Sequence, residues 1–252
     1  MLVALIMFNF DLHIHSCLSP CADLDNSPKV IGRRAKEVGL NGIMLSDHNS
    51  SRNAPAMKEV CRREGLQMLY GMEITTAEEA HCLAIFDTQQ QADQMMEYIY
   101  DCLPVIPNDP DIFGTQIVVD ADEQVIEMEP MLLSAPTGIR IVDAGKRIHE
   151  LGGLFVAAHL DRAYFSVTSQ LGGLAGDEGF DAVEISRHVD LEEWRERCLG
   201  LPVLRNSDAH YVDDIGAIYN TADLKEFSVA ALKDALARSG VKFAGSAVTA
   251  KK

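Results

Sequence analysis

Short apolar runs alternate with amphipathic stretches along most of the 252-residue chain. An apolar run of four to eight residues between turn residues is typical of a buried strand, whereas apolar spacings of three and four indicate a helix. The strands predicted in this way cover residues 8–15, 42–45, 66–72, 82–86, 154–159, 180–186, 202–207 and 241–244. The predicted helices cover residues 28–39, 54–64, 89–102, 137–151, 191–198 and 229–238.

One segment, residues 104–135, interrupts this alternation. Three prolines end the helical pattern, and two β-prone runs at 116–119 and 124–127 then flank an acidic turn. Two such runs around a short polar turn predict a β-hairpin. Because the hairpin contains no histidine, we expect it to border a site rather than supply ligands, with its acidic side chains in solvent.

Polar side chains follow the ends of nearly all the predicted strands. An α/β barrel builds its active site from the carboxyl ends of its strands, whereas a doubly wound open sheet concentrates function at one switch point. Around seven strands separated mostly by helices therefore favour a closed or nearly closed parallel barrel. The length suits a single domain over residues 1–252, since α/β barrels of this size fold as one unit.

Charge and cysteine usage narrow the expected partners. The chain has 22 basic and 38 acidic residues, a formal charge of −16, which opposes attraction to nucleic-acid backbones. We therefore expect a small-molecule substrate rather than a nucleic-acid polymer, although several bound divalent cations would cancel part of this charge locally. The six cysteines form no Cys-x-x-Cys pair, and the apolar start, Met1–Phe8, lacks a basic region and a cleavage site. We expect a cytoplasmic protein with reduced thiols and no membrane span; its oligomeric state stays open.

The densest chemistry lies in the run Asp11-Leu12-His13-Ile14-His15-Ser16. Residues two apart in a strand share one face at a spacing of about 7 Å, so His13 and His15 can converge on one cation. The run Asp208-Ala209-His210 repeats this spacing with a carboxylate and an imidazole. An isolated histidine is usually a core or surface residue, as we expect for His149, but donors at several strand ends support one another as ligands. The other strand-end donors are His48, Glu73, His81 and His159.

These donor types indicate a metal-dependent hydrolase. Imidazole and carboxylate ligands together suit zinc, manganese or iron(II) rather than magnesium or calcium alone. Two such ions about 3.5–4 Å apart can activate a water molecule and clamp the attacking and leaving oxygens of a phosphoryl group. Glu184 also lies near a strand end, where we expect it in a salt bridge or at a solvated edge.

Three further residues are candidates for catalytic roles: Asp47, Arg162 and His188. Asp47 is placed to orient a ligand or a water molecule. A guanidinium matches phosphate oxygens in a bidentate fashion, which favours Arg162 as a phosphate ligand, with Arg52 and Arg187 as alternatives. His188 follows a strand end and can reach substrate, although a surface role is the alternative.

At these positions the chain resembles the PHP family, the polymerase and histidinol phosphatase superfamily. The resemblance extends from residue 8 to about residue 216, and its motifs occur in the family's order. It implies a distorted seven-stranded (β/α)7 TIM-like barrel that holds two to three divalent metals in a trinuclear site. The matching motifs are Asp11–Ser16, Ser46-Asp47-His48, Gly71-Met72-Glu73-Ile74, His81, His159 and Ser207-Asp208-Ala209-His210.

The resemblance also implies how the ligands divide among the metals. The third metal needs one more ligand from the loop after the first strand, where Pro20 departs from the family pattern. Counting back from Ser27-Pro28 assigns Asp23 to this position, and Cys21 is the alternative. The other ligands would be His13, His15, Glu73 and Asp208 for the first metal, Glu73, His81 and His159 for the second, and His48 and His210 for the third.

The resemblance implies a metal-dependent phosphoesterase that attacks its substrate with a metal-bound hydroxide. We expect the substrate to be a small phosphorylated metabolite or nucleotide. The alternative enzyme is a 3′-to-5′ exonuclease or oligonucleotide phosphodiesterase. The alternative of another class is a non-catalytic, metal-stabilised domain that docks onto a partner. The sequence decides neither between a phosphate monoester and a diester nor which metals bind.

Overall fold

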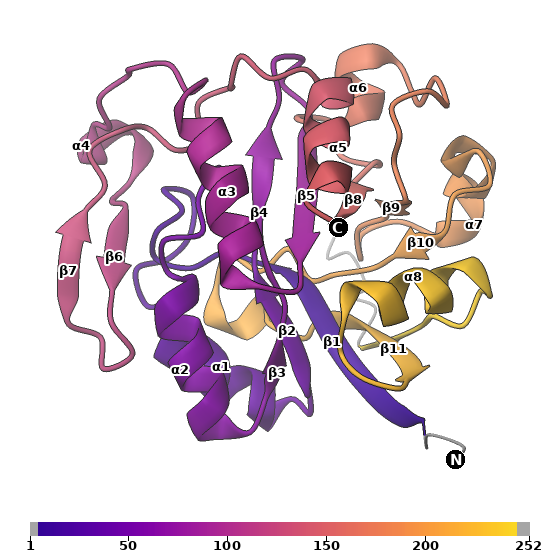
Figure 1. Cartoon of the computed structure of the whole chain (residues 1–252), viewed down its shortest axis with the longest axis horizontal. Helices are drawn as coiled ribbons and strands as arrows, with labels where there is room; N and C mark the ends of the chain where they lie inside the picture. Colours follow the sequence, from indigo (N-terminus) through magenta and orange to yellow (C-terminus); the bar gives the residue numbers. More distant parts are fainter. Residues whose placement is uncertain (1–4, 246–252) are drawn as a thin grey trace.

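The computed structural model describes residues 5–245, in which strands and helices alternate through most of the chain (Figure 1). The prediction of an α/β fold is confirmed. The prediction of a seven-stranded TIM-like barrel is not, because the regular ladders form two five-stranded sheets and a hairpin, and several neighbouring strands run antiparallel. Residues 1–4 of the predicted lead-in lie outside the described residues.

The first sheet has the order β12 (Lys242–Gly245), β11 (Ile218–Leu224), β1 (Ile6–Ile14), β2 (Gly42–Leu45) and β3 (Gln67–Met68). β1, β2 and β3 are parallel, whereas β11 runs antiparallel to both β1 and β12. The apolar pattern does not predict β11, because its buried face includes the polar residue Asn220.

The second sheet has the order β10 (Val203–Leu204), β9 (Ala182–Glu184), β8 (Leu154–Ala157), β5 (His81–Phe86) and β4 (Tyr70–Thr75). β5 runs antiparallel to both of its neighbours, β4 and β8. Isolated bridges connect the two sheets, one between Ile14 and Ala209 and one between His48 and Glu73. These residues lie within the predicted ligand motifs, so the seam between the sheets runs through the candidate site.

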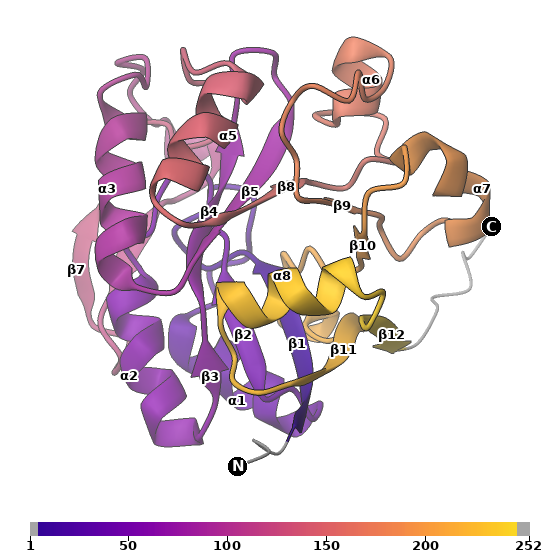
Figure 2. The same cartoon turned by 45° about the vertical axis from the view of Figure 1, so that its right-hand side comes forward.

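Most of the helices cover the outer faces of the sheets, whereas α8 packs against the core between them (Figure 2). One expected helix starts late, because the amide and hydroxyl of Thr137 both donate to the carbonyl of Thr75, at 2.9 and 3.0 Å, and delay the helix to Ile141. Within residues 5–245, no helix combines the length and apolar character that a membrane span requires. The longer helices are α1 (Pro28–Glu37), α2 (Ala54–Glu64), α3 (Gln89–Tyr100), α5 (Ile141–Glu150) and α8 (Val229–Ala237). The short ones are α4 (Pro110–Phe113), α6 (Val167–Leu171), α7 (Leu191–Trp194) and two 3-10 turns, Arg195–Cys198 and Val212–Asp214.

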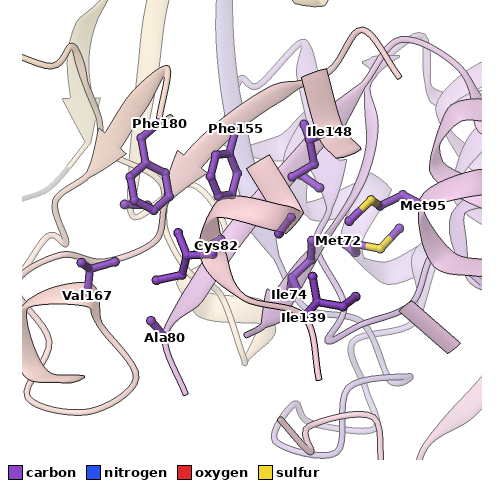
Figure 3. Close-up of a cluster of buried hydrophobic side chains, with 14 of the residues drawn as sticks. Met72, Ile74, Ala80, Cys82, Met95, Ile139, Ile148, Phe155, Val167 and Phe180 are labelled. Atoms are coloured by element: carbon purple, nitrogen blue, oxygen red, sulfur yellow. The ribbon is translucent and has the colours of Figure 1, made fainter. Parts of the chain in front are cut away.

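Two main apolar cores hold these layers together. The inner core lies between the sheets, where Phe8, Phe10 and Leu12 of β1 pack with Leu232 of α8. The outer core lies between the second sheet and helices α3 and α5, around Phe155 (Figure 3). Each fully buried side chain of this kind stabilises the fold by roughly 1.5–3 kcal/mol. The strands that carry the candidate ligands are therefore fixed from both sides.

β6 (Ile117–Val119) and β7 (Val125–Met128) form an antiparallel hairpin at the position predicted from the sequence. Its acidic side chains Asp122, Glu123 and Glu127 are exposed, as expected, although each forms an ion pair. Glu123 accepts from Lys29 of α1 at 2.7 Å, and buried Glu129, just after β7, accepts from Arg52 at 2.8 Å. Arg52 is thus held in an ion pair at the hairpin rather than free to bind a phosphate.

The close contact between β4 and β5 at Gly71 yields a test of the fold. A Cβ atom at this position would lie 2.2 Å from the carbonyl oxygen of Ala84, a backbone atom that cannot move alone. We expect Gly71→Ala to lower the free energy of unfolding by about 1–3 kcal/mol in urea denaturation. Gly138→Ala is the control, because its Cβ would have an ordinary contact at 3.6 Å, and its effect should stay within about 0.5 kcal/mol. Equal stability of the two variants would contradict this description of the sheet.

Candidate metal centre

A β-bulge in β1 aims the first two histidines. The register between β1 and β2 shifts between Asp11 and Ile14, where the amide of His13 donates to the carboxylate of Asp11. Before the shift, even-numbered residues face the inner core; after it, Ile14 packs in a different core beside α1 and α2. A bulge of this kind redirects the side chains that follow it. His13 and His15 consequently point together into the seam between the sheets, with their Nε2 atoms 3.2 Å apart.

Glu73, on β4, is the hub of the centre. Its side chain is almost wholly buried, and both carboxylate oxygens face imidazole nitrogens. These imidazoles belong to both sheets and to the segments that follow their strands. The distances from Oε1 are 3.0 Å to His81 Nδ1, 3.0 Å to His159 Nε2 and 3.3 Å to His13 Nε2, and those from Oε2 are 3.3 Å to His15 Nε2 and His48 Nδ1.

Asp208 supplies the second buried carboxylate, from the segment after β10. Its Oδ1 lies 3.3 Å from His13 Nε2, 3.4 Å from His15 Nε2 and 3.5 Å from His210 Nδ1. The backbone φ is +50° at Asp208 and +27° at His159, values that residues with a Cβ rarely adopt. Such backbone strain persists where surrounding contacts impose it and concentrates at functional sites. Here it turns both side chains into the centre just past their strand ends.

Hydrogen bonds outside the centre fix the tautomers of three histidines. His13 Nδ1 lies 3.0 Å from Glu184, which can only accept as a carboxylate, so this nitrogen carries the proton. The Ser19 hydroxyl donates to Asp47 at 2.7 Å, so it accepts from His15 Nδ1 at 3.0 Å. His210 Nδ1 donates to the backbone carbonyl of Asp208 at 2.9 Å. When each of these three rings is neutral, its Nε2 is left with a lone pair.

This arrangement fits a bound cation. In these neutral tautomers, the Nε2 lone pairs of His13 and His15 face each other and the carboxylates of Glu73 and Asp208. Buried groups that are all acceptors repel one another unless positive charge lies between them. An imidazole that donates its other N–H to a carboxylate, carbonyl or hydroxyl is also the usual form of a metal-bound histidine. The donor set therefore fits divalent metal ions.

The pKa values of the buried histidines and carboxylates also show that the centre favours positive charge. Burial lowers the pKa of His15, but Asp208 and Glu73 beside it raise the pKa to about 9. Burial likewise opposes protonation of His13, yet Glu184, Asp208 and Glu73 raise its pKa well above the ordinary value. The pKa of Asp208 lies well below its usual range, because the surrounding histidines outweigh the effect of burial. The carboxylates are thus ionised and draw cations into the centre.

The structure brings eight of the nine predicted ligands together and leaves the ninth outside. Asp23 is exposed, and its carboxylate accepts the amide of Asp25. Cys21 instead reaches the centre: its Sγ and ring nitrogens of His15 and His210 lie within 4.8 Å of one another. Two further sets of donor atoms also lie within 4.8 Å of one another: those of His13, His15 and Glu73, and those of His48, Glu73 and His81. All six cysteines are free thiols.

The three predicted catalytic residues occupy different places. Asp47 is buried behind the centre and accepts from Ser16 and Ser19, so it touches His15 only through Ser19. Arg162 lies at the rim, with its guanidinium against Oδ2 of Asp208. His188 lies on an exposed loop, and its pKa is lowered by partial burial and by the charge of two neighbouring arginines, one of them Arg162.

Of the two alternatives expected for Glu184, a salt bridge or a solvated edge, the structure shows the first, with His13 as the partner. Glu184 is buried rather than at a solvated edge, and it accepts from His13, from the amide of His159 at 3.1 Å and from Asn206 at 2.6 Å. The sequence does indicate that Glu184 is buried, because it lies between Val183 and Ile185 in an apolar strand. A carboxylate inside a buried strand requires hydrogen-bonding partners. Arg187 is also unavailable for phosphate, since it pairs with Asp214.

Comparisons with known proteins agree with this geometry. The model of the PHP domain family matches residues 11–140, slightly more than half of the chain. A stretch of 107 residues is 34% identical to the uncharacterized protein YqxK of Bacillus subtilis strain 168 and covers 36% of this chain and 28% of that protein.

Solved structures share the fold at low sequence identity. The lesion-specific endonuclease PfuEndoQ of Pyrococcus furiosus is 19% identical, with a TM-score of 0.71 over 94% of this chain and 58% of that one. Endonuclease Q bound to a 27-mer duplex substrate is 20% identical, with a TM-score of 0.69 over 95% and 60% of the two chains. A two-domain protein of Bacteroides vulgatus with a predicted PHP-like metal-dependent phosphoesterase is 17% identical, with a TM-score of 0.58 over 96% and 65%. The chain thus spans less than two thirds of each of these proteins.

The exclusion of nucleic acid on the ground of net charge is wrong. Endonuclease Q, which shares this fold, binds a DNA duplex with an abasic lesion at its active site. The charge of −16 is a sum over the whole chain, whereas binding depends on the local field. Divalent cations are often the largest charges in a site, so they would reverse the sign of the field at this cluster of donors.

The contact between Glu184 and His13 generates a test of the metal centre. Glu184→Gln keeps the size of the side chain but removes the charge and one acceptor oxygen, so His13 loses its fixed tautomer. We expect metal affinity to fall about 10–100-fold, measured by competition with a chromophoric chelator. Glu178→Gln is the matched control, because this buried glutamate caps the amides of Ala175 and Gly176 instead. Equal affinity losses in the two variants would refute a specific role for Glu184.

Proposed function

The chain belongs to the PHP domain family, and we propose that it is a metal-dependent phosphoesterase that cleaves phosphodiester bonds in nucleic acid. The observation that carries the proposal is the buried centre itself, in which the Nε2 atoms of His13 and His15 lie 3.2 Å apart and 3.3 Å from carboxylate oxygens of Glu73 and Asp208. The likeness of the fold to that of endonuclease Q over 94% of the chain supports nucleic acid as the substrate class.

We assign three metal positions to the centre. The third includes Cys21 in place of Asp23, because its thiol lies with His15 and His210. A thiol among imidazoles favours zinc over harder cations at that position. The proposed ligands are His13, His15, Glu73 and Asp208 for the first metal, Glu73, His81 and His159 for the second, and His48, His210 and Cys21 for the third.

Residues of the chain would divide the work of hydrolysis. When bound, divalent cations lower the pKa of a coordinated water and neutralise charge on the phosphoryl group. Glu184 and the Asp47–Ser19 pair hold the rings of His13 and His15 in position. Arg162, at the rim, pairs with Asp208. Because Asp208 would be a metal ligand, unlike the partners of Arg52 and Arg187, the guanidinium would then be free to donate hydrogen bonds to a phosphate oxygen.

Hydrolysis of labelled oligonucleotides tests the proposal. Protein stripped of metal and reloaded with manganese or zinc should cleave single-stranded DNA or a duplex with an abasic site, as resolved on a denaturing gel. Asp208→Asn should lower the rate at least about 100-fold, because this carboxylate contacts three of the histidines. Asp223→Asn is the control, since Asp223 is exposed on β11, away from the centre, and its rate should not change.

Two outcomes would contradict the proposal in different ways. Hydrolysis of small phosphorylated metabolites without cleavage of any oligonucleotide would make the enzyme a phosphatase and refute the substrate class. Absence of turnover on every phosphoester, with metal bound, would favour a non-catalytic domain that docks onto a partner.

A further inference from the structure

A cavity of about 290 Å³ opens directly beside the metal centre. One side is lined by His81 and His159, and the other by Arg162, Tyr164 and Phe165 of the loop after β8. Ligand sites commonly measure about 300–1,000 Å³, so this cavity holds a group the size of one base or sugar. A group seated there would touch two of the proposed metal ligands.

The loop that forms the far side of this cavity is anchored to the centre. The carbonyl of Phe165 accepts the amide of His81 at 2.7 Å, and the two rings stack with centroids 4.9 Å apart and planes 9° apart. The φ of Phe165 is +56°, a strained value for an aromatic residue. The hydroxyl of Ser166 donates to the carbonyl of Arg162 at 2.7 Å and closes the loop. These contacts fix the residues on either side of Tyr164.

Tyr164 is the more exposed of the two aromatic residues in this anchored loop. Its side chain is 76% accessible although it lines the cavity, and it belongs to none of the buried apolar clusters. A tyrosine is a rigid ring that offers a stacking face to any base regardless of sequence. Folding of the core does not account for an aromatic ring at this position, whereas binding of a planar group does.

Charge favours stacking as the source of affinity. Arg162 is the one basic residue among the six that line this cavity. A site with a single arginine gains little from counterion release, the term that dominates most nucleic-acid binding. Stacking on an aromatic ring supplies affinity that depends weakly on salt.

We propose that Tyr164 is the platform on which one unstacked nucleobase lies, with Arg162 on the phosphate next to it. The base must leave its own stack, because a base inside a duplex cannot reach the wall of a cavity. This proposal rests on the proposed nucleic-acid phosphodiesterase and names the part of the substrate that its site recognises. The preferred substrates are then single strands, ends or lesions at which a base is displaced.

Fluorescence of 2-aminopurine tests this proposal without relying on turnover. The probe is a short single-stranded oligodeoxynucleotide that carries one 2-aminopurine and phosphorothioate linkages to slow cleavage. Manganese-loaded wild-type protein should quench the probe on binding, because a base stacked on an aromatic ring loses fluorescence. Tyr164→Ala should abolish the quenching and raise Kd about 10-fold or more, whereas Tyr164→Phe, which keeps the ring, should behave as wild type.

Two further measurements separate failure of this inference from failure of the proposed function. Inorganic phosphate should compete with the probe for wild-type protein, and its affinity and the bound manganese should be unchanged in Tyr164→Ala. The salt dependence of Kd should correspond to about one or two phosphates, with a slope of about 0.7 for each in log–log form.

If Tyr164→Ala bound and quenched the probe as wild type does, the stacking platform would be overturned but the proposed function would stand. A salt dependence of Kd that corresponds to five or more phosphates would have the same consequence. Binding of inorganic phosphate without any binding of the oligonucleotide would overturn the proposed substrate class as well.

Discussion

The molecule is organised around a buried cluster of histidine nitrogens and carboxylate oxygens that is stable only with positive charge among them. His13 and His15 direct Nε2 lone pairs at each other and at the carboxylates of Glu73 and Asp208, at distances between 3.2 and 3.4 Å. In a medium of low dielectric constant such an arrangement is costly unless a cation lies among the donors. The bulge in β1 and the positive φ angles at His159 and Asp208 all serve to build it.

The location of the centre follows from the division of the fold into two sheets. β1 and β2 deliver His13, His15 and His48 from one sheet, while β4 and β5 deliver Glu73 and His81 from the other. The isolated bridge between His48 and Glu73 is where the two sheets touch. A bound metal would therefore join the two halves of the fold as well as perform chemistry. The loop with Tyr164 leaves β8 beside this junction, so the proposed stacking platform would lie next to the proposed metal positions.

The sequence predicts the donors well because their positions follow strand periodicity. Spacing by two places His13 beside His15, and eight of the predicted donor side chains lie close together. Periodicity fails where the backbone departs from a regular strand. Strict alternation along β8 would put His159 with Phe155 and Ala157 in the outer core, and only its positive φ turns it into the centre.

Counting along a loop fails for a related reason, because the turn at residues 17–25 brings Cys21 rather than Asp23 to the site. Contacts between distant segments are also hidden from local patterns. The bond from His13 to Glu184 spans 171 residues, and the antiparallel neighbours of β5 give two sheets where strand count alone favours a barrel.

Anomalous scattering from crystals soaked in zinc tests the central claim most directly. The account predicts a peak about 2.0–2.1 Å from Nε2 of both His13 and His15, the usual distance from zinc to a histidine nitrogen, with Glu73 and Asp208 completing the ligands. Crystals that hold zinc elsewhere on the protein, with Nε2 of His13 and His15 left in contact only with each other and the carboxylates, would contradict it.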